Sequence, residues 1–533
     1  MVRLLLISIG SLICTEIYGQ AVISGQDLVR DYLRLLEIRG KPLPSPIFYY
    51  ANQTSLWEAD STSEADFGAW SDYLTNFREE KGGGLKITPL SPSFTYNYSS
   101  RYPRSYNDGP VWNGRGSTIS LNAGIEVEWG ILKAVFYPNY YIAQNKEFPL
   151  YFFKLPNKSI YSYQFAQNID YVQRFGNSAH GDFDLGQSSL GIEFRNFSVK
   201  ISNENLWWGP SLSNPILMSN AGPGFLHIDL GTAKPWVTKF GDFELHHVWG
   251  RLKESQYFDT DPNNNKRYFV GASFGYRPSF IKELKGLSFG FARVLYRSWP
   301  TNHLKLQDVF LSVNNPGRND EADEMTSIFT RWYFEEAGVE IYSEWTGSDS
   351  DTDVWDFFQE ITNSMAFTLG FQKTFSANNG FWRFGLEHTT LARTRTNVRK
   401  AFPIFYVNDL VRQGYTHDGQ LIGASIGPGS KNQLLRLDRF IENGKFSFSF
   451  QRFRSDDDAF YNIVGPLRYL ESRDVEFTFG LGYTMFTRNM EIGANMYYSR
   501  RSNRYYFYGD DLDNYQFLTY VRMHIFRDKS LNF

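Results

Sequence analysis

The stretch that decides the fold is TISLNAGIEVEWGILKAVFYPNYYI, residues 118–142. In its first half the odd positions from Ile119 to Trp129 are all apolar, while the even positions carry Thr, Ser, Asn, Gly and Glu. This period of two places every apolar side chain on one face of a β-strand. After a short break at Gly130 and Ile131, a second alternating run begins at Leu132. Two strands joined so tightly must pair antiparallel.

This strand pattern predicts a transmembrane β-barrel rather than a soluble sandwich. One face of each strand is apolar, aromatic residues gather near the strand ends, and a strand has about ten residues. The composition fits the same class, because 47 Phe and 34 Tyr contribute to an aromatic share of 18% although the mean hydropathy is negative. A barrel with a polar lumen and aromatic girdles needs that combination, since only alternate residues contact lipid.

Length and charge limit the remaining possibilities. A soluble chain of 533 residues is expected to form roughly three or four domains. No change of composition divides this chain after residue 90, so we expect one barrel over residues 91–533. The formal net charge of -3 gives no indication of a nucleic-acid partner.

Residues 1–20 are typical of a secretory signal peptide. Arg3 precedes an apolar run from Leu4 to Ile13, which is too short to span a bilayer as a helix. The only cysteine, Cys14, lies in this segment and does not follow the small residue that a lipid anchor needs. The mature chain is therefore expected to contain neither thiol nor disulfide. No later segment has the ~18 consecutive apolar residues of a membrane helix.

Two amphipathic helices are predicted between the signal and the barrel. Ser24–Asp27 can cap a helix that ends at Gly40, and Ser63–Asp66 starts a second helix that ends at Gly82–Gly84. Their apolar stripes are interpreted as packing faces rather than as cofactor sites. We expect residues 21–90 to form a small helical domain that lies in the periplasm or plugs the barrel.

Alternating strands continue from Pro92 to the end of the chain. Short breaks fall near 130, 280–286, 335–338, 376–380, 441–445 and 487–489, and long breaks near 143–188, 300–325, 347–360, 393–430, 455–472 and 502–514. With short turns in the periplasm and long loops outside, both termini are predicted to be periplasmic. This gives about sixteen antiparallel strands, and a further hairpin around 151–165 would make about eighteen. Because successive strands alternate in direction, Trp207–Pro235 is predicted to follow a strand that runs towards the periplasm. This segment then lies in the periplasm or folds into the lumen as a plug.

Three motifs could carry chemistry, and each has a simpler interpretation. Gly271–Gly275 matches the G-x-S-x-G pattern of hydrolases, but strand residues flank it on both sides and no helix follows. His246 and His247 point to opposite faces of a strand, so they are not expected to form a metal site. Asp456–Asp458 could bind calcium or contact lipopolysaccharide cations, although a solvated loop is the default interpretation. The sequence contains no nucleotide-binding or zinc motif, and no cofactor is predicted.

Several segments do not follow the generic barrel pattern. They are rich in Gly, Pro and Trp, and comprise Pro103–Pro110, Trp112–Gly116, Ser202–Pro210, Ile216–Phe225, Gly414–Gly423 and Ser425–Gly427. These segments resemble the Wzi family of capsule assembly proteins. The resemblance runs from Asp31–Arg34 through Ile169–Gly176 to the last strands, and it departs from the family at Ala424, where a His is expected.

The resemblance implies an eighteen-stranded outer-membrane barrel with a helical bundle on its periplasmic side and no enzymatic activity. It also implies a protein that holds capsular polysaccharide or exopolysaccharide at the cell surface, in contact with outer-membrane lipid and lipopolysaccharide. The alternative is a porin-like channel for sugars or small solutes. Ion conductance would distinguish the two, because a plugged tether is nearly closed.

Candidate polysaccharide-binding residues lie in two places. The alternation of strand directions places residues 393–430 outside the cell. In this segment Arg412, Tyr415 and His417 offer stacking faces and hydrogen-bond donors. In the Gly-rich and Pro-rich segment, Trp207 and Trp208 either fill space or stack on sugar rings, and packing is the favoured role. We therefore predict a site in the outer loops, with the lumen around the two tryptophans as the alternative.

Overall fold

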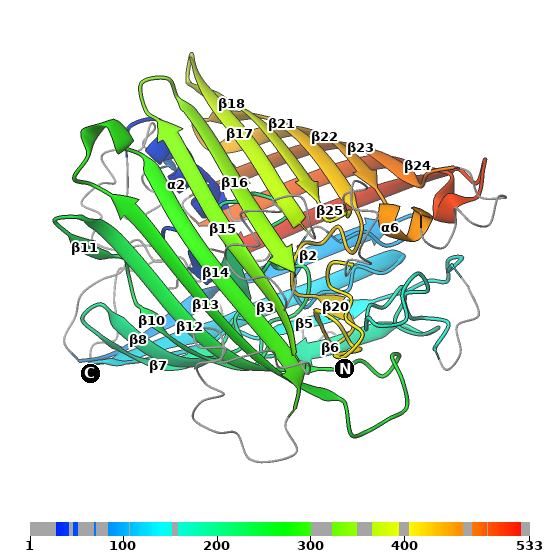
Figure 1. The fold of residues 1–533 in the computed structure, drawn as a ribbon. Helices are drawn as coiled ribbons and strands as arrows, with labels where there is room; N and C mark the ends of the chain where they lie inside the picture. The colour runs from blue at the N-terminus through cyan, green and yellow to red at the C-terminus, as the bar shows by residue number, and fades with distance from the viewer. Residues whose placement is uncertain are drawn as a thin grey trace, which may run out of the picture.

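The computed structural model describes residues 28–41, 46–51, 69–70, 84–105, 107–151, 158–299, 322–348, 365–393, 404–461, 472–487 and 489–523. In this part of the chain the strands form one closed antiparallel barrel of eighteen strands, which lies within the predicted range of about sixteen to eighteen (Figure 1). The signal segment lies outside the described residues. Of the predicted helix over 63–81, only Ala69 and Trp70 are described, and both are helical.

The strands follow each other around the barrel in chain order. The first nine are β2 (Leu85–Ser99), β3 (Gly116–Trp129), β4 (Leu132–Phe136) continued by β5 (Asn139–Ala143), β6 (His180–Asp184) continued by β7 (Ser189–Phe194), β8 (Phe197–Ser202), β10 (His227–Thr232) continued by β11 (Trp236–Thr238), β12 (Gly241–Lys253), β13 (Lys266–Pro278) and β14 (Leu287–Ser298). The second nine are β15 (Ala322–Phe334), β16 (Val339–Ser348), β17 (Met365–Ala377), β18 (Gly380–Thr390), β21 (Lys431–Ile441), β22 (Gly444–Arg454), β23 (Val475–Phe486), β24 (Met490–Ser502) and β25 (Leu512–Met523). The barrel closes between β25 and β2, where Tyr98 pairs with Phe517.

The two ends of the barrel differ in the length of their connections. The turns after β3, β7, β17, β21 and β23 have only a few residues, and we call this the turn end. The longer connections after β2, β5, β8, β12, β18 and β22 lie at the opposite end, the loop end. The predicted separation of short and long connections is therefore confirmed. No helix in the described part of the chain is long and apolar enough to cross a membrane.

The predicted direction of the segment after β8 is wrong. Residues 189–202 form a hairpin of two strands, β7 and β8, which turns at Arg195 in a left-handed conformation with a φ of 55°. The apolar positions change from even numbers before this turn to odd numbers after it, because the turn changes the register of the alternation. This hairpin contributes to the total of eighteen strands. Residues 152–157 of the predicted hairpin at 151–165 lie outside the described part of the chain, and its predicted second strand is not formed, since residues 158–165 contain only an isolated bridge at Ser162.

Alternate residues of each strand face outwards and are large and apolar. Leu245, Phe289 and Phe479 are exposed on this face, whereas inward positions carry buried polar residues such as Ser327 and Thr368. This arrangement matches the predicted apolar outer face and polar lumen.

Two of the three motifs with possible chemistry lie in strands of this barrel. His246 points inwards and lies 3.1 Å from Asp229, whereas its neighbour His247 packs on Trp249, so the two histidines occupy opposite faces as predicted. Gly271–Gly275 lies within β13, with strand on both sides.

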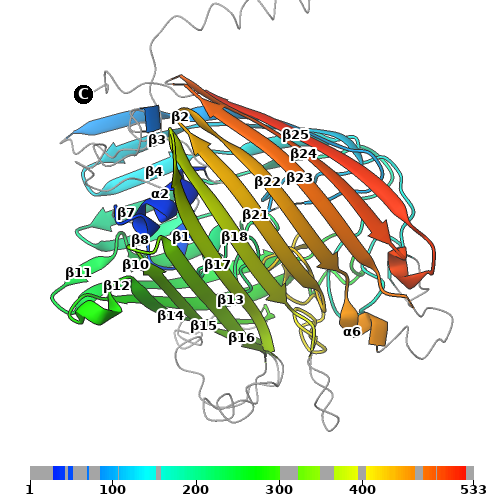
Figure 2. The ribbon, with the colours of Figure 1, turned by 90° about the horizontal axis from the view of Figure 1, so that it is seen from above.

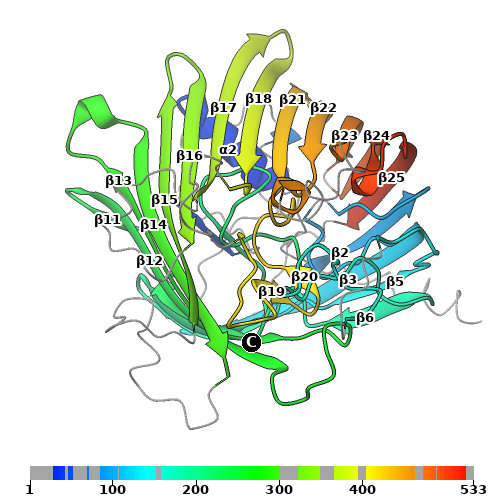
Figure 3. The ribbon, with the colours of Figure 1, turned by 45° about the vertical axis from the view of Figure 1, so that its right-hand side comes forward.

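Two segments that leave the barrel at the loop end fold back into its lumen. They are residues 203–226 and 404–430, which we call the plug. In the plug, β9 (Leu206–Trp208) pairs with β1 (Tyr49–Ala51), and β19 (Thr416–His417) pairs with β20 (Gln420–Leu421). Figure 3 shows β19 and β20 within the ring of strands. Buried apolar side chains of the plug share one core with inward-facing residues of β12–β15, including Val248 and Phe329.

Helix α2 (Leu28–Ile38) lies at the turn end, and α6 (Asp457–Ala459) lies at the loop end (Figure 2). Leu28, Tyr32, Leu35 and Leu36 form the predicted apolar stripe of α2, and all four are buried. Their partners are the barrel residues Tyr333, Phe381, Phe440 and Phe486, together with Trp70, whose ring stacks on Tyr32 with 3.9 Å between centroids. The prediction that this stripe is a packing face is confirmed.

Candidate functional site

The plug leaves part of the lumen open. A cavity of about 430 Å³ lies between the plug and the strands β18 and β21–β24. At the loop end it is lined by residues such as Phe148 and Tyr505, and at the turn end by Leu28 and Asp31 of α2. The cavity therefore extends along the barrel from the outer loops to the N-terminal helix.

The wall of this cavity is a ladder of hydroxyl and amide side chains. It consists of inward-facing residues on three neighbouring strands, namely Ser447, Ser449 and Gln451 on β22, Thr478 and Thr484 on β23, and Asn495 and Tyr497 on β24. Gly480 and Gly482 also face inwards, and the missing Cβ atoms leave room for their neighbours, since a Cβ would lie 2.4 Å from Ser449 Oγ at Gly480 and 2.3 Å from Asn495 Oδ1 at Gly482. Ser449 and Asn495 make no side-chain hydrogen bond to any other residue that the structure describes. Their polar atoms are thus available to a ligand.

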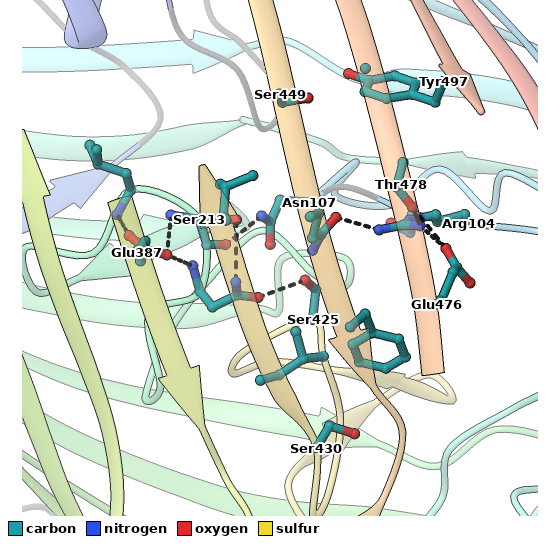
Figure 4. A pocket seen from close by; sticks show the side chains of 18 of the residues that line it. Arg104, Asn107, Ser213, Glu387, Ser425, Ser430, Ser449, Glu476, Thr478 and Tyr497 are labelled. Atoms are coloured by element: carbon teal, nitrogen blue, oxygen red, sulfur yellow. Dashed lines mark hydrogen bonds and ion pairs between the residues drawn. The ribbon is translucent and has the colours of Figure 1, made fainter. Parts of the chain in front are cut away.

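Arg104 fixes the connection between β2 and β3 inside the barrel (Figure 4). Its guanidinium forms an ion pair with Glu476 and donates to Ser499 Oγ at 3.2 Å and to Thr478 Oγ1. Three residues later Asn107, with a φ of 67°, donates through Nδ2 to the carbonyl oxygen of Ser213 at 2.8 Å. This connection is therefore tied both to the barrel wall and to the plug.

Carboxylates of the barrel wall hold the backbone of the plug. Glu387 on β18 accepts hydrogen bonds from the N–H groups of Leu212, Ser213 and Asn214 at 2.7–3.1 Å, and from Tyr342 Oη at 2.8 Å. These contacts occupy the lone pairs of the carboxylate, so Glu387 holds the plug in place. Glu344 holds the plug in the same way, because it accepts from the Ile216 N–H at 3.1 Å, whereas Glu244 accepts from the Phe48 N–H at 2.8 Å and holds the N-terminal segment that pairs with the plug.

Aromatic and basic residues complete the lining. The basic residues are Arg30, Arg34, Arg104, Arg383, Arg436, Lys445, Arg501 and Arg504, against the acidic residues Asp31, Glu387 and Glu476. The aromatic rings include Trp112, Phe165, Trp207, Tyr497 and Tyr505. Rings of this kind stack on the C–H faces of sugars, and guanidinium groups bind carboxylates through paired hydrogen bonds.

The predicted outer-loop residues are mostly buried. Tyr415 has no exposed surface and donates through its hydroxyl to the carbonyl oxygen of Leu217 at 2.8 Å. His417 is also buried, and its Nδ1 accepts a hydrogen bond from the Lys253 N–H at 3.0 Å. Burial lowers the pKa of His417 to about 4. Arg412 is exposed and lies 3.4 Å from Asn168 Oδ1. The structure therefore does not bring these three side chains together on one surface.

The two tryptophans have different positions. Trp207 lines the cavity and donates through Nε1 to the carbonyl oxygen of Ser211 at 3.1 Å. The centroid of its ring lies 4.5 Å from Arg30 Cζ. Trp208 is fully buried in the core that the plug shares with the barrel. Of the two, only Trp207 reaches the cavity.

The acidic run Asp456–Asp458 is not a solvated loop. All three residues are buried, because Asp456 caps α6 and its Oδ1 accepts from the Ala459 N–H at 2.9 Å. Asp457 accepts from Arg473 at 2.9 Å, and Asp458 accepts from the Arg393 N–H at 3.1 Å. Burial raises the pKa of Asp456 to about 7. Within the described residues no group of three or more His, Cys, Asp or Glu side chains could hold a metal ion.

The sequence prediction missed the cavity wall. Its signal is present in the strands, since Ser447, Ser449 and Gln451 occupy the polar positions between Phe446, Phe448 and Phe450. The strands of the barrel generally carry polar residues at their inward-facing positions. The pattern alone therefore does not indicate which of these positions border a cavity.

Comparisons with known proteins agree with this architecture. The family model for capsule assembly protein Wzi matches residues 93–514. Among solved structures, an outer-membrane protein of Escherichia coli described as Wzi, involved in group 1 capsule assembly and a carbohydrate-binding β-barrel, has a TM-score of 0.62 at 12% identity and covers 95% of this chain and 100% of its own. The OprD protein of Pseudomonas aeruginosa has a TM-score of 0.41 at 11% identity over 83% of this chain and 96% of its own. Among curated proteins no match was found. The chain belongs to the family of the capsule assembly protein Wzi.

Proposed function

We propose that this outer-membrane barrel holds capsular polysaccharide or exopolysaccharide at the cell surface by binding a segment of the glycan in its lumen cavity, without catalysing a reaction. The observation that carries the proposal is the cavity wall. A ladder of hydroxyl and amide groups on β22–β24 and several aromatic rings line the same space of about 430 Å³. Family membership supports the same role.

The wall is chemically matched to a sugar chain. Sugar hydroxyls both donate and accept, and so do the Ser449 hydroxyl and the Asn495 amide, which have no partner in the described part of the chain. The ring of Tyr497 lies beside the inward-facing Gly480, where it adds an aromatic surface to the wall. A non-enzymatic role is supported by the two cavity glutamates, because Glu387 binds plug backbone and Glu476 pairs with Arg104. Neither of them is free to act as an acid or a base.

The proposal is tested by removing the two unpartnered polar groups together. Each hydrogen bond contributes about 0.5–1.5 kcal/mol, so the Ser449→Ala, Asn495→Ala variant should bind the polysaccharide about tenfold more weakly. Cells that carry it should release polysaccharide into the medium. The matched control is Met496→Ala, on the exposed outer face of the same strand β24. Undiminished binding and surface retention in the double variant would contradict the proposal.

A further inference from the structure

Three cations share two carboxylates where the cavity meets helix α2. Arg383 Nη2 lies 2.6 Å from Asp438 Oδ2, and Arg383 also donates to Asp31 of α2, with 2.9 Å between Nη2 and Oδ2. Lys445 Nζ lies 3.2 Å from Asp31 Oδ2. Arg436 lies 3.3 Å from Asp438 and 3.7 Å from Asp31. The same two carboxylates thus serve all three cations.

The charges of this cluster do not balance. No other carboxylate in the described ranges lies within ion-pair distance of Arg383, Arg436 or Lys445. The remaining polar neighbours are neutral, since Ser447 donates to Asp438 at 2.5 Å and Gln372 accepts from Arg383 at 3.3 Å. One positive charge is therefore left over in a largely buried place, where an unpaired charge is costly.

The surplus charge faces the cavity. Arg383, Arg436 and Lys445 all line it, and so does Asp31. Their exposure differs, because the side chain of Arg383 is 1% exposed and that of Lys445 is 8% exposed, whereas that of Arg436 is 26% exposed. Arg436 also has the longest ion-pair distances of the three cations. It is the group best placed to take up a further anion.

We infer that this cluster is a subsite for one carboxylate of the polysaccharide, held by Arg436 and Lys445 at the turn-end part of the cavity. A guanidinium binds a carboxylate through paired hydrogen bonds, and such bonds are stronger than those between neutral groups. The ligand would then carry an acidic sugar unit, and that unit would lie deepest in the barrel, against α2. The inference rests on the proposed function, because it assigns a further contact to the same bound glycan.

Helix α2 takes part in this subsite. Asp31 supplies one of the two carboxylates, so the surplus of positive charge depends on its ionised side chain. The change Asp31→Asn keeps the size of the side chain and raises the surplus from one charge to two. It should therefore strengthen the binding of an acidic glycan, whereas Arg436→Gln removes the surplus and should weaken it.

The experiment compares two forms of one ligand on the purified full-length protein. The ligand is the polysaccharide isolated from cells that produce this protein, used in its native form and after reduction of its carboxyl groups to alcohols. We expect Arg436→Gln to weaken binding of the native form about tenfold and to leave binding of the reduced form unchanged. The matched control is Arg452→Gln, on the same strand as Lys445. The side chain of Arg452 donates to Gln433 Oε1 at 2.8 Å and does not line the cavity.

The outcomes distinguish a failure of the proposed subsite from a failure of the proposed function. Equal binding of the native and reduced forms by the wild-type protein would overturn the subsite and leave the proposed function standing. If Arg436→Gln weakened binding of the native and reduced forms to the same extent, the subsite would also be overturned and the proposed function would stand. Failure of the wild-type protein to bind either form would overturn the proposed function and the subsite together. Tighter binding of the native form by Asp31→Asn would support the charge surplus, and weaker binding would contradict it.

Discussion

Arg34 of helix α2 binds Glu340 of β16 through both carboxylate oxygens, with Nε at 3.0 and 3.1 Å, although the two residues are 306 positions apart. The same guanidinium donates through Nη1 to the carbonyl oxygen of Pro210 in the plug at 2.6 Å. One side chain thus connects the N-terminal helix, the barrel wall and the plug. Glu340 has no exposed surface, so this contact is protected from solvent screening.

Arg34→Ala should loosen the packing of helix α2 against the barrel wall and the plug. Glu340 keeps its ion pair with Arg331, so we expect the docking of α2 to weaken by about 3 kcal/mol, the lower end of the range for a broken buried pair. The wild-type protein should be nearly closed in planar bilayers, and this variant should conduct more ions. The control is Arg439→Ala, which removes a half-buried arginine at the turn end that donates to the carbonyl oxygen of Asn378. A wild-type barrel that already conducts freely would favour the channel instead.

A tag inserted at Gly509 should be labelled on intact cells. This residue lies in the loop-end connection between β24 and β25, where a Cβ would meet nothing within 4 Å and the neighbouring Tyr508 is 87% exposed. A tag at Asn379, in the turn between β17 and β18, should be inaccessible. Labelling of the second tag and not the first would reverse the assignment of the two ends.

Tyr415→Ala should damage the plug rather than remove a ligand contact. Its ring is fully buried and stacks on Tyr406 with 5.5 Å between centroids, so we expect a loss of about 3–5 kcal/mol in plug stability. Limited proteolysis of the folded barrel should then cut within 404–430. Arg412→Ala, at an exposed position, should leave both the cleavage pattern and polysaccharide binding unchanged. Lost binding with an intact plug in Arg412→Ala would restore the outer-loop site.

Acidification should loosen the plug around His417. Burial lowers the pKa of this residue from 6.5 to about 4, so the unfolded segment takes up a proton below pH 6.5 while the folded plug does not. Stability is complete above pH 6.5 and falls as the pH approaches 4, by up to about 3 kcal/mol at about 1.4 kcal/mol per pKa unit. The protection factors of the amides around His417, which correct for the intrinsic pH dependence of hydrogen exchange, should therefore be lower at pH 4.5 than at pH 7. His417→Gln should remove the difference, and an unchanged difference in that variant would point to another group.

The barrel could be predicted from the sequence because its signals are local. The alternation in 118–142 and the apolar stripe of α2 depend on residues a few positions apart, and both predictions agree with the structure. The β7–β8 hairpin was missed because Arg195 and Asn196 interrupt a run that otherwise reads as one strand. That single turn reversed the predicted side of residues 203–226.

The site could not be predicted in the same way because it depends on contacts between distant segments. Tyr415 and His417 belong to a stretch rich in Arg and aromatic residues that reads as a surface loop. The chain turns back into the lumen at Gly414 and Gly419, which have φ values of 64° and 77°. These glycines were the available signal for a plug. The pairing of Arg436 with Asp31, by contrast, joins residues from opposite ends of the chain and leaves no local pattern.

The central claim, that the lumen cavity binds the polysaccharide, is tested most directly by filling the cavity. A Cβ at Gly482 would meet the movable end of Asn495 at 2.3 Å and otherwise extend into the cavity, so Gly482→Phe should occupy space that the glycan needs. The control is Met496→Phe, which adds the same ring on the exposed outer face of the neighbouring strand β24, outside the cavity lining. Equilibrium binding of the isolated polysaccharide to both purified proteins, each shown to be folded by heat-modifiable migration, is the measurement. We predict at least a roughly tenfold loss of affinity for Gly482→Phe and none for Met496→Phe, since even ~1.4 kcal/mol of lost contact changes affinity by that factor. Equal affinities would contradict the claim.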